Sequence, residues 1–188
     1  MKFVKPVAFL LAATILCNFS FAQNSNKMNT VEVGGAPMYP SKNIIQNAMN
    51  SKDHTTLVAA VKAAGSVETL QTAGPFTVFA PTNEAFAMLP PGTVDNLLMP
   101  ENKSKLSSIL TYHVVKGKLD SKELGRLITE GNGKATLWTV NGERLWLMMK
   151  GNAIWIKDEN GGTAKVTIKD VYQSNGVIHV IDHVVMPK

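Results

Sequence analysis

The chain has 188 residues, of which 45% are hydrophobic and 18% are charged, and its formal net charge is +5. This length corresponds to one domain that can bury a sizeable core, and the composition excludes a chain that is disordered throughout. The single cysteine excludes an intramolecular disulfide and any zinc site built from several cysteines.

The first 22 residues have the pattern of a secretory signal peptide. Lys2 and Lys5 precede an apolar run over residues 7–17, and residues 20–22 offer small side chains at the positions that a signal peptidase reads. The run is shorter than the ~20 residues that span a bilayer, so we expect cleavage rather than a transmembrane segment. Because both lysines leave with the signal, the formal charge falls from +5 to +3 and the only cysteine is lost. The product is expected in the medium, on the cell surface or in the periplasm.

Residues 23–40 are rich in Asn, Gly, Ser and Pro and lack apolar periodicity. This composition is typical of a flexible arm. We therefore expect a signal peptide over residues 1–22, an arm over residues 23–40 and one globular domain over residues 41–188.

The first part of this domain has apolar residues at helical spacing. Ser41, Asp53, Thr82 and Asp120 each stand where a side chain can cap a helix. Helices are expected over residues 41–49, 53–64, 67–72, 82–89 and 120–128, and short strands over 76–80 and 114–119. Between them we expect a short helix through Val94, Leu97 and Leu98 and a helix that buries Leu106, Ile109 and Leu110 and ends near Tyr112-His113.

After Gly133 the apolar period changes to two, which indicates strands. Asn141-Gly142 and Gly151-Asn152 are both hairpin signals. Strands are expected over residues 137–140, 143–149, 153–157, 164–172 and 177–185. The fold class is therefore α+β, with helices first and an antiparallel meander after them.

Three segments carry a family resemblance. They are FTVFAPTNEAF at residues 76–86, LTYHVV at residues 110–115 and NGVIHVIDHVVMP at residues 175–187. Together, in this order, they resemble the signature blocks of a fasciclin (FAS1) domain over roughly residues 41–188. The chain is similar to single-domain, secreted, bacterial-type members of that family.

The resemblance implies a β-wedge of antiparallel strands with a helical N-terminal half packed on it. It also implies a role in cell adhesion or matrix contact, and it makes Tyr112 and His113 candidate partner-binding residues. The spacing of His113 from Leu106, Ile109 and Leu110 leaves a second reading open, in which this histidine is a hydrogen-bonded core residue.

Nothing in the sequence points to catalysis or to a cofactor. The motifs of zinc proteases, serine hydrolases, P-loop proteins and dinucleotide-binding proteins are missing. His179 and His183 are four residues apart in one predicted strand, about 13 Å, which is too far to chelate one ion. We therefore expect no enzyme, no metal site and no cofactor.

The second hairpin predicts an aromatic face. If Gly151-Asn152 is a two-residue turn, Met148 pairs with Trp155, and Trp146, Met148 and Trp155 share one face of the sheet. The aliphatic residues of both strands then form the opposite face, which suits the core. An exposed aromatic face would fit a sugar ring, an apolar ligand or a protein partner, unless a helix or the arm covers it.

Basic residues also gather around the Tyr-His pair. They are Lys103, Lys105, Lys116, Lys118, Lys122 and Arg126. Such a cluster could attract an acidic polysaccharide or could simply be a solvated surface, whereas export and the low net charge argue against nucleic acid. The expected function is a secreted adhesion or interaction module that binds a matrix protein, a surface protein or a polysaccharide. The alternative is a carrier for a small hydrophobic or aromatic ligand, and the oligomeric state is left open.

Overall fold

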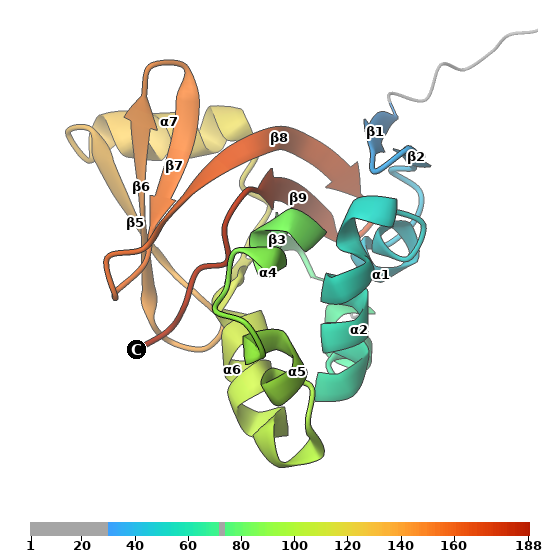
Figure 1. Ribbon diagram of the computed structural model, residues 1–188. Helices are drawn as coiled ribbons and strands as arrows, with labels where there is room; N and C mark the ends of the chain where they lie inside the picture. The colour runs from blue at the N-terminus through green and yellow to red at the C-terminus, as the bar shows by residue number, and fades with distance from the viewer. Residues whose placement is uncertain (1–29, 72–73) are drawn as a thin grey trace, which may run out of the picture.

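The computed structural model describes residues 30–71 and 74–188 (Figure 1). The helices are α1 (Ile44–Ala48), α2 (Thr55–Ala64), α3 (Val67–Gln71), α4 (Asn83–Ala87), α5 (Thr93–Leu97), α6 (Lys103–Tyr112) and α7 (Ser121–Glu130), with short 3₁₀ segments at Lys52–His54 and Pro100–Asn102. The strands are β1 (Val31–Val33), β2 (Ala36–Met38), β3 (Phe76–Pro81), β4 (Val114–Lys116), β5 (Lys134–Trp138), β6 (Arg144–Lys150), β7 (Ala153–Lys157), β8 (Thr163–Gln173) and β9 (Gly176–Ile181). Among the described helices, none has the length and apolar character needed to cross a membrane.

Local sequence signals explain several helix ends, but Asp53 does not cap α2 as predicted, because it lies in the 3₁₀ segment before that helix. Thr82 caps α4 by accepting a hydrogen bond from the Ala85 amide at 3.2 Å, and Asp120 caps α7 in the same way. Helix α2 ends at Gly65 in the left-handed conformation. The cap of α1 differs from the prediction: Asn43, not Ser41, forms a capping box with Gln46.

The main sheet has seven strands in the order β4-β3-β9-β8-β7-β6-β5. All its neighbouring strands are antiparallel except β3 and β9, which run parallel from Phe76↔Gly176 to Pro81↔Ile181. The prediction of a purely antiparallel meander is wrong at this pair. A hairpin turn dictates the relative direction of two strands, but no such turn joins segments about a hundred residues apart.

Gly176 allows the close start of the β3–β9 pairing. A Cβ atom at this position would lie 2.1 Å from the carbonyl oxygen of Phe76. The preceding Asn175 accepts from the Phe76 amide through its backbone carbonyl and donates through its side chain to the carbonyl of Leu70. The Asn175-Gly176 pair therefore joins β9 to β3 and α3, in addition to turning the chain.

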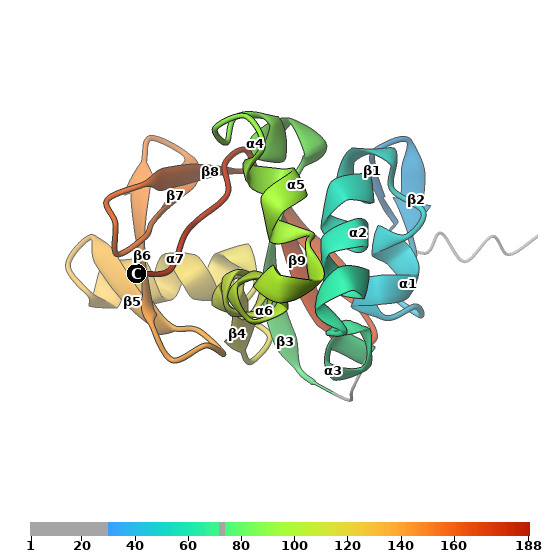
Figure 2. The same cartoon turned by 60° about the horizontal axis from the view of Figure 1, so that its bottom comes forward.

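The predicted arm needs a correction over its second half. Residues 31–38 form the β1–β2 hairpin, and Val33 and Met38 are buried in the core. Figure 2 shows this hairpin beside α1, at the opposite end of the molecule from α7 and β5. The hairpin was missed because two three-residue strands are too short to show periodicity. The predicted signal peptide, residues 1–22, lies outside the described residues.

Two hydrophobic clusters form the core. The first lies between helices α1, α2, α3 and α6 and strands β3 and β9. The second lies under β5, β6 and β7, where α7 contributes Leu124 and Ile128. Helix α7 packs against β5 and β6, so it covers one face of this part of the sheet (Figure 1).

Candidate interaction face

The predicted register of the second hairpin is confirmed. Lys150 pairs with Ala153, and Met148 pairs with Trp155, across the Gly151-Asn152 turn. Trp146 and Trp155 therefore lie on the same face of β6 and β7. The aliphatic residues Leu145, Leu147, Ile154 and Ile156 lie on the other face, where each has at most 5% of its surface exposed.

We call the opposite face the tryptophan face. It consists of the outward-facing residues Lys134, Trp138, Arg144, Trp146, Met148, Lys150, Trp155, Lys157 and Lys165 on β5 to β8. Trp138 is 64% exposed, and Trp146, Met148 and Trp155 are half-buried. All three tryptophans of the chain lie on it.

Trp138 also belongs to this face, which was not predicted from the sequence. Trp138 pairs with Arg144 across β5 and β6, which places it one row beyond Trp146. The signal that could have identified Trp138 is the alternation along β5. Lys134, Thr136 and Trp138 are exposed, whereas Ala135 and Leu137 are buried. Trp138 was missed because strands over 137–140 and 143–149 around an Asn141-Gly142 turn pair it with Leu145 on the aliphatic face, whereas the observed register pairs it with Arg144.

A cation lies over each indole ring. Lys150 Nζ is 4.4 Å from the ring centre of Trp155, and Lys134 Nζ is 4.8 Å from that of Trp146. The guanidinium carbon of Arg144 is 5.4 Å from the Trp146 ring and 5.8 Å from the Trp138 ring. Cation–π attraction holds such groups against aromatic rings, with energies of about 0.5–1 kcal/mol at exposed sites.

Tyr112 supports this face from behind. Its hydroxyl donates to the carbonyl oxygen of Arg144 at 2.7 Å and accepts from the amide of Glu159 at 3.2 Å. Glu159 in turn pairs with the Arg144 guanidinium at 3.1 Å, and this contact lowers the pKa of the Glu159 carboxyl. Burial raises the pKa of Tyr112 to about 12, so the phenol stays protonated and keeps its donor.

Tyr112 and His113 are therefore not contact residues in this structure, which corrects the prediction. Tyr112 has no exposed surface and His113 has 3%. His113 Nδ1 is 2.8 Å from the carbonyl oxygen of Ile109, and its Nε2 accepts from the amide of Val185. Burial lowers the pKa of His113 to about 4, so the ring is neutral at pH 7 and joins the end of α6 to the C-terminal segment.

The other histidines do not come together. His179 is fully buried, its Nε2 lies 2.8 Å from the carbonyl oxygen of Leu119, and its ring stacks on Phe79. His183 lies on the surface beyond β9 and pairs with Asp182, while buried His54 contacts Ser51. Across residues 30–71 and 74–188, no three His, Cys, Asp or Glu side chains are grouped as metal ligands.

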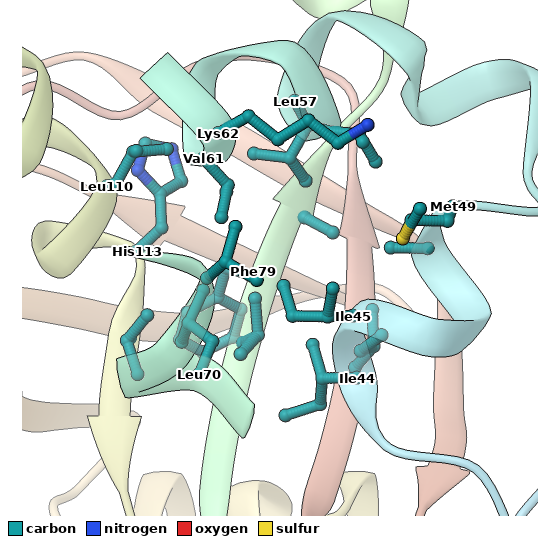
Figure 3. Close-up of a pocket in the computed structure, with 17 residues that line it drawn as sticks. Ile44, Ile45, Met49, Leu57, Val61, Lys62, Leu70, Phe79, Leu110 and His113 are labelled. Atoms are coloured by element: carbon teal, nitrogen blue, oxygen red, sulfur yellow. The ribbon is translucent and has the colours of Figure 1, made fainter. Parts of the chain in front are cut away.

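An apolar pocket lies between α1, α2, α3 and the β3–β9 pair (Figure 3). Figure 3 shows Ile44, Ile45 and Leu70 on one side and Val61 and Leu57 on another, with His113 at the margin. Its volume is about 60 Å³. A cavity that binds benzene measures about 150 Å³, so this pocket is too small for a ligand of that size.

The family model described as Fasciclin domain matches residues 52–187. The chain belongs to the fasciclin family. The predicted resemblance is thereby confirmed, and residues 76–86, 110–115 and 175–187 are fasciclin segments. In this fasciclin domain the first and third segments form β3 with α4 and β9 with the C-terminal segment, and the second contains Tyr112 and His113.

Several relatives match most of this domain. Protein sll1483 of Synechocystis sp. is 41% identical over 98% of this chain and 99% of its own length. The transforming growth factor-beta-induced protein ig-h3 of Oryctolagus cuniculus is 35% identical over 79% of this chain but only 20% of its own length. The immunogenic protein MPB70 of Mycobacterium bovis is 37% identical over 74% of this chain and 66% of its own length. A solved FAS1 domain pair from the insect cell adhesion molecule fasciclin I aligns with 68% of this chain and 40% of that chain, at 26% identity and a TM-score of 0.46.

Proposed function

We propose that this fasciclin domain is a secreted, non-enzymatic adhesion or interaction module whose contact surface is the tryptophan face. The observation that supports it is the arrangement of Trp138, Trp146 and Trp155 on one side of β5 to β7, while α7 covers the other side. Indole rings supply large contact area at a low cost in conformational entropy, and they are enriched among the residues that dominate binding energy.

Membership in the fasciclin family supports an interaction role, because the family resemblance implies cell adhesion or matrix contact. The β-wedge arrangement is part of the same proposal, with the helical N-terminal half on one side and β5 to β8 on the other. Secretion follows from the signal pattern over residues 1–22. The expected partner is a matrix protein, a surface protein or a polysaccharide.

The direct test is adhesion of beads coated with the protein to an array of matrix proteins and glycans. Trp146→Ala/Trp155→Ala is expected to lower bead retention at least tenfold, because the variant removes the centre of the face. The matched control is Met88→Ala/Met99→Ala, which removes two apolar side chains that are 60% and 45% exposed elsewhere on the surface.

Circular dichroism and urea unfolding on each variant show whether the fold is retained. Retention lost in the tryptophan variant and kept in the methionine variant supports the proposal. Equal retention in both variants excludes the tryptophan face, and no retention on any array position excludes the adhesion function.

A further inference from the structure

The tryptophan face is also a basic surface. Lys134, Lys150, Lys157 and Lys165 are exposed on it together with Arg144. Of these five cations, only Arg144 has a carboxylate within 4 Å among residues 30–71 and 74–188, and that carboxylate belongs to Glu159. The four lysines therefore present uncompensated positive charge beside the three indoles.

The strand register sets the spacing of these charges. Lys134, Met148, Trp155 and Lys165 form one row across β5 to β8, and Trp146 and Lys157 belong to the next row. Strands lie about 4.8 Å apart, and outward residues repeat about every 6.7 Å along a strand. The face is thus a two-dimensional array of cations and rings on a rigid sheet.

The indole rings hold the cations in place before any ligand arrives. The ammonium of Lys150 lies 4.4 Å over Trp155, and that of Lys134 lies 4.8 Å over Trp146. A lysine that is already confined loses less rotamer entropy when it pairs with an anion. This arrangement favours a ligand that brings several negative groups over a flat surface.

The basic residues that lie near the Tyr-His pair in sequence are spread over α6, β4 and α7, so they differ from this face. Among them, Arg126 already pairs with Glu123 and Glu130 on α7. Lys118 lies over Tyr172, next to Asp120, which accepts a hydrogen bond from the Tyr172 hydroxyl. Carboxylates therefore neutralise part of that cluster, and charge complementarity to a polyanion is greatest at the tryptophan face.

We infer that the tryptophan face binds an acidic polysaccharide, a sugar chain that repeats carboxylate or sulfate groups. The inference rests on the proposed interaction function and names its ligand class. The lysines pair with the anionic groups, and the edges of the indole rings and Met148 contact the apolar side of the sugar rings. Stacked nucleic-acid bases fit less well, because they need open ring faces and the cations lie over the faces of Trp146 and Trp155.

Intrinsic fluorescence provides the test, because all three tryptophans belong to the face. The full chain without its signal is titrated with alginate, which carries carboxylates, heparin, which also carries sulfates, neutral dextran and a single-stranded DNA. Alginate or heparin is expected to change the emission, and raising the salt from 50 to 300 mM is expected to weaken binding at least tenfold because salt screens exposed charges. Dextran is expected to change nothing.

Two charge-matched variants make the test specific. Replacing Lys134, Lys150, Lys157 and Lys165 by Gln is expected to weaken binding at least tenfold. The control replaces four lysines of the other cluster, Lys103, Lys105, Lys118 and Lys122, by Gln and is expected to change the affinity less than threefold. Equal loss in both variants would mean that net charge alone drives binding, and that result overturns the inference.

The remaining outcomes are also decisive. Binding of neither alginate nor heparin overturns the inference, and so does tighter binding of DNA. If beads still adhere to a matrix protein through Trp146 and Trp155 in that case, the proposed function stands and only the ligand class fails. If adhesion is absent as well, both proposals fail.

Discussion

The hydroxyl of Tyr112 donates a 2.7 Å hydrogen bond to the backbone carbonyl of Arg144, and this bond connects the end of α6 to the first residue of β6. The Arg144 side chain lies on the other side of the strand, over Trp138 and Trp146. A buried residue of the second fasciclin segment thus positions a cation of the tryptophan face. A substitution at Tyr112 can therefore alter binding without this side chain touching a partner.

Removing the Tyr112 hydroxyl should destabilise the fold. Tyr112→Phe leaves the carbonyl of Arg144 and the amide of Glu159 without this partner, at a cost of about 1–3 kcal/mol in the free energy of unfolding. Urea unfolding monitored by circular dichroism measures the change. Tyr172→Phe is the control, because its hydroxyl bonds Asp120 on the surface, and a change within about 0.5 kcal/mol is expected there. Equal effects of the two substitutions would contradict a structural role for the buried hydroxyl.

Stability should fall in mild acid because of His113. Its folded pKa of about 4 lies below the unfolded value of 6.5, so between these pH values the unfolded chain binds more protons. The free energy of unfolding therefore falls as the pH drops from 6.5 to about 4, by roughly 3 kcal/mol for this group. The lowered pKa values of buried His54 and His179 act in the same direction.

Urea unfolding at pH 7, 6, 5 and 4 measures this pH dependence. His113→Gln is expected to be less stable at pH 7 but to show a smaller decline with pH. His183→Gln removes an exposed ring and is expected to keep the full decline. A wild-type protein whose stability is constant between pH 7 and 4 would refute the buried neutral state of these histidines.

The N-terminal hairpin should contribute to stability as part of the core. Met38 is 3% exposed, and Met38→Ala is expected to cost about 2–5 kcal/mol in the free energy of unfolding, because it leaves a cavity next to Val33. Met88→Ala, at a position that is 60% exposed, is expected to change it by less than about 0.5 kcal/mol. Denaturant unfolding compares the two, and a neutral Met38→Ala would restore the view of residues 31–38 as a dispensable arm.

The charge beside the indoles should be visible in fluorescence quenching. Iodide is expected to quench the tryptophans several times more efficiently than caesium, because Lys134, Arg144 and Lys150 attract the anion and repel the cation. The Stern–Volmer constants of both ions give the ratio. Replacing the four lysines of the face by Gln should bring this ratio closer to one. A wild-type ratio near one would show that the face has no positive field.

Short-range signals made much of this domain predictable. The turn at Gly151-Asn152 sets the register of β6 against β7, so the shared face of Trp146 and Trp155 could be predicted from two strands and one turn. Thr82 and Asp120 likewise mark helix starts, because a cap depends on amides only two or three residues away. The fasciclin segments identify the family for the same reason, since each is a local pattern.

The burial of the Tyr-His pair and the direction of β3 against β9 were mispredicted because they depend on contacts between distant segments. Tyr112 and His113 are buried because the β7–β8 loop and the C-terminal segment reach them, at Glu159 and Val185. The parallel direction of β3 and β9 has the same kind of origin. A period of three or four along a helix predicts one apolar side, but it does not predict which loops cover the ends of that helix.

By itself, the sequence determined which residues alternate, which turns close hairpins and to which family the chain belongs. Only the tertiary structure decided that the Tyr-His pair is an internal junction and that lysines from four different strands lie around three indoles. The physical reason is that alternation divides a strand into two faces but does not say which face is packed. That choice depends on the free energy gained when one face is buried against α7 and distant parts of the chain. Burying the aliphatic face gains more than burying the tryptophan face would.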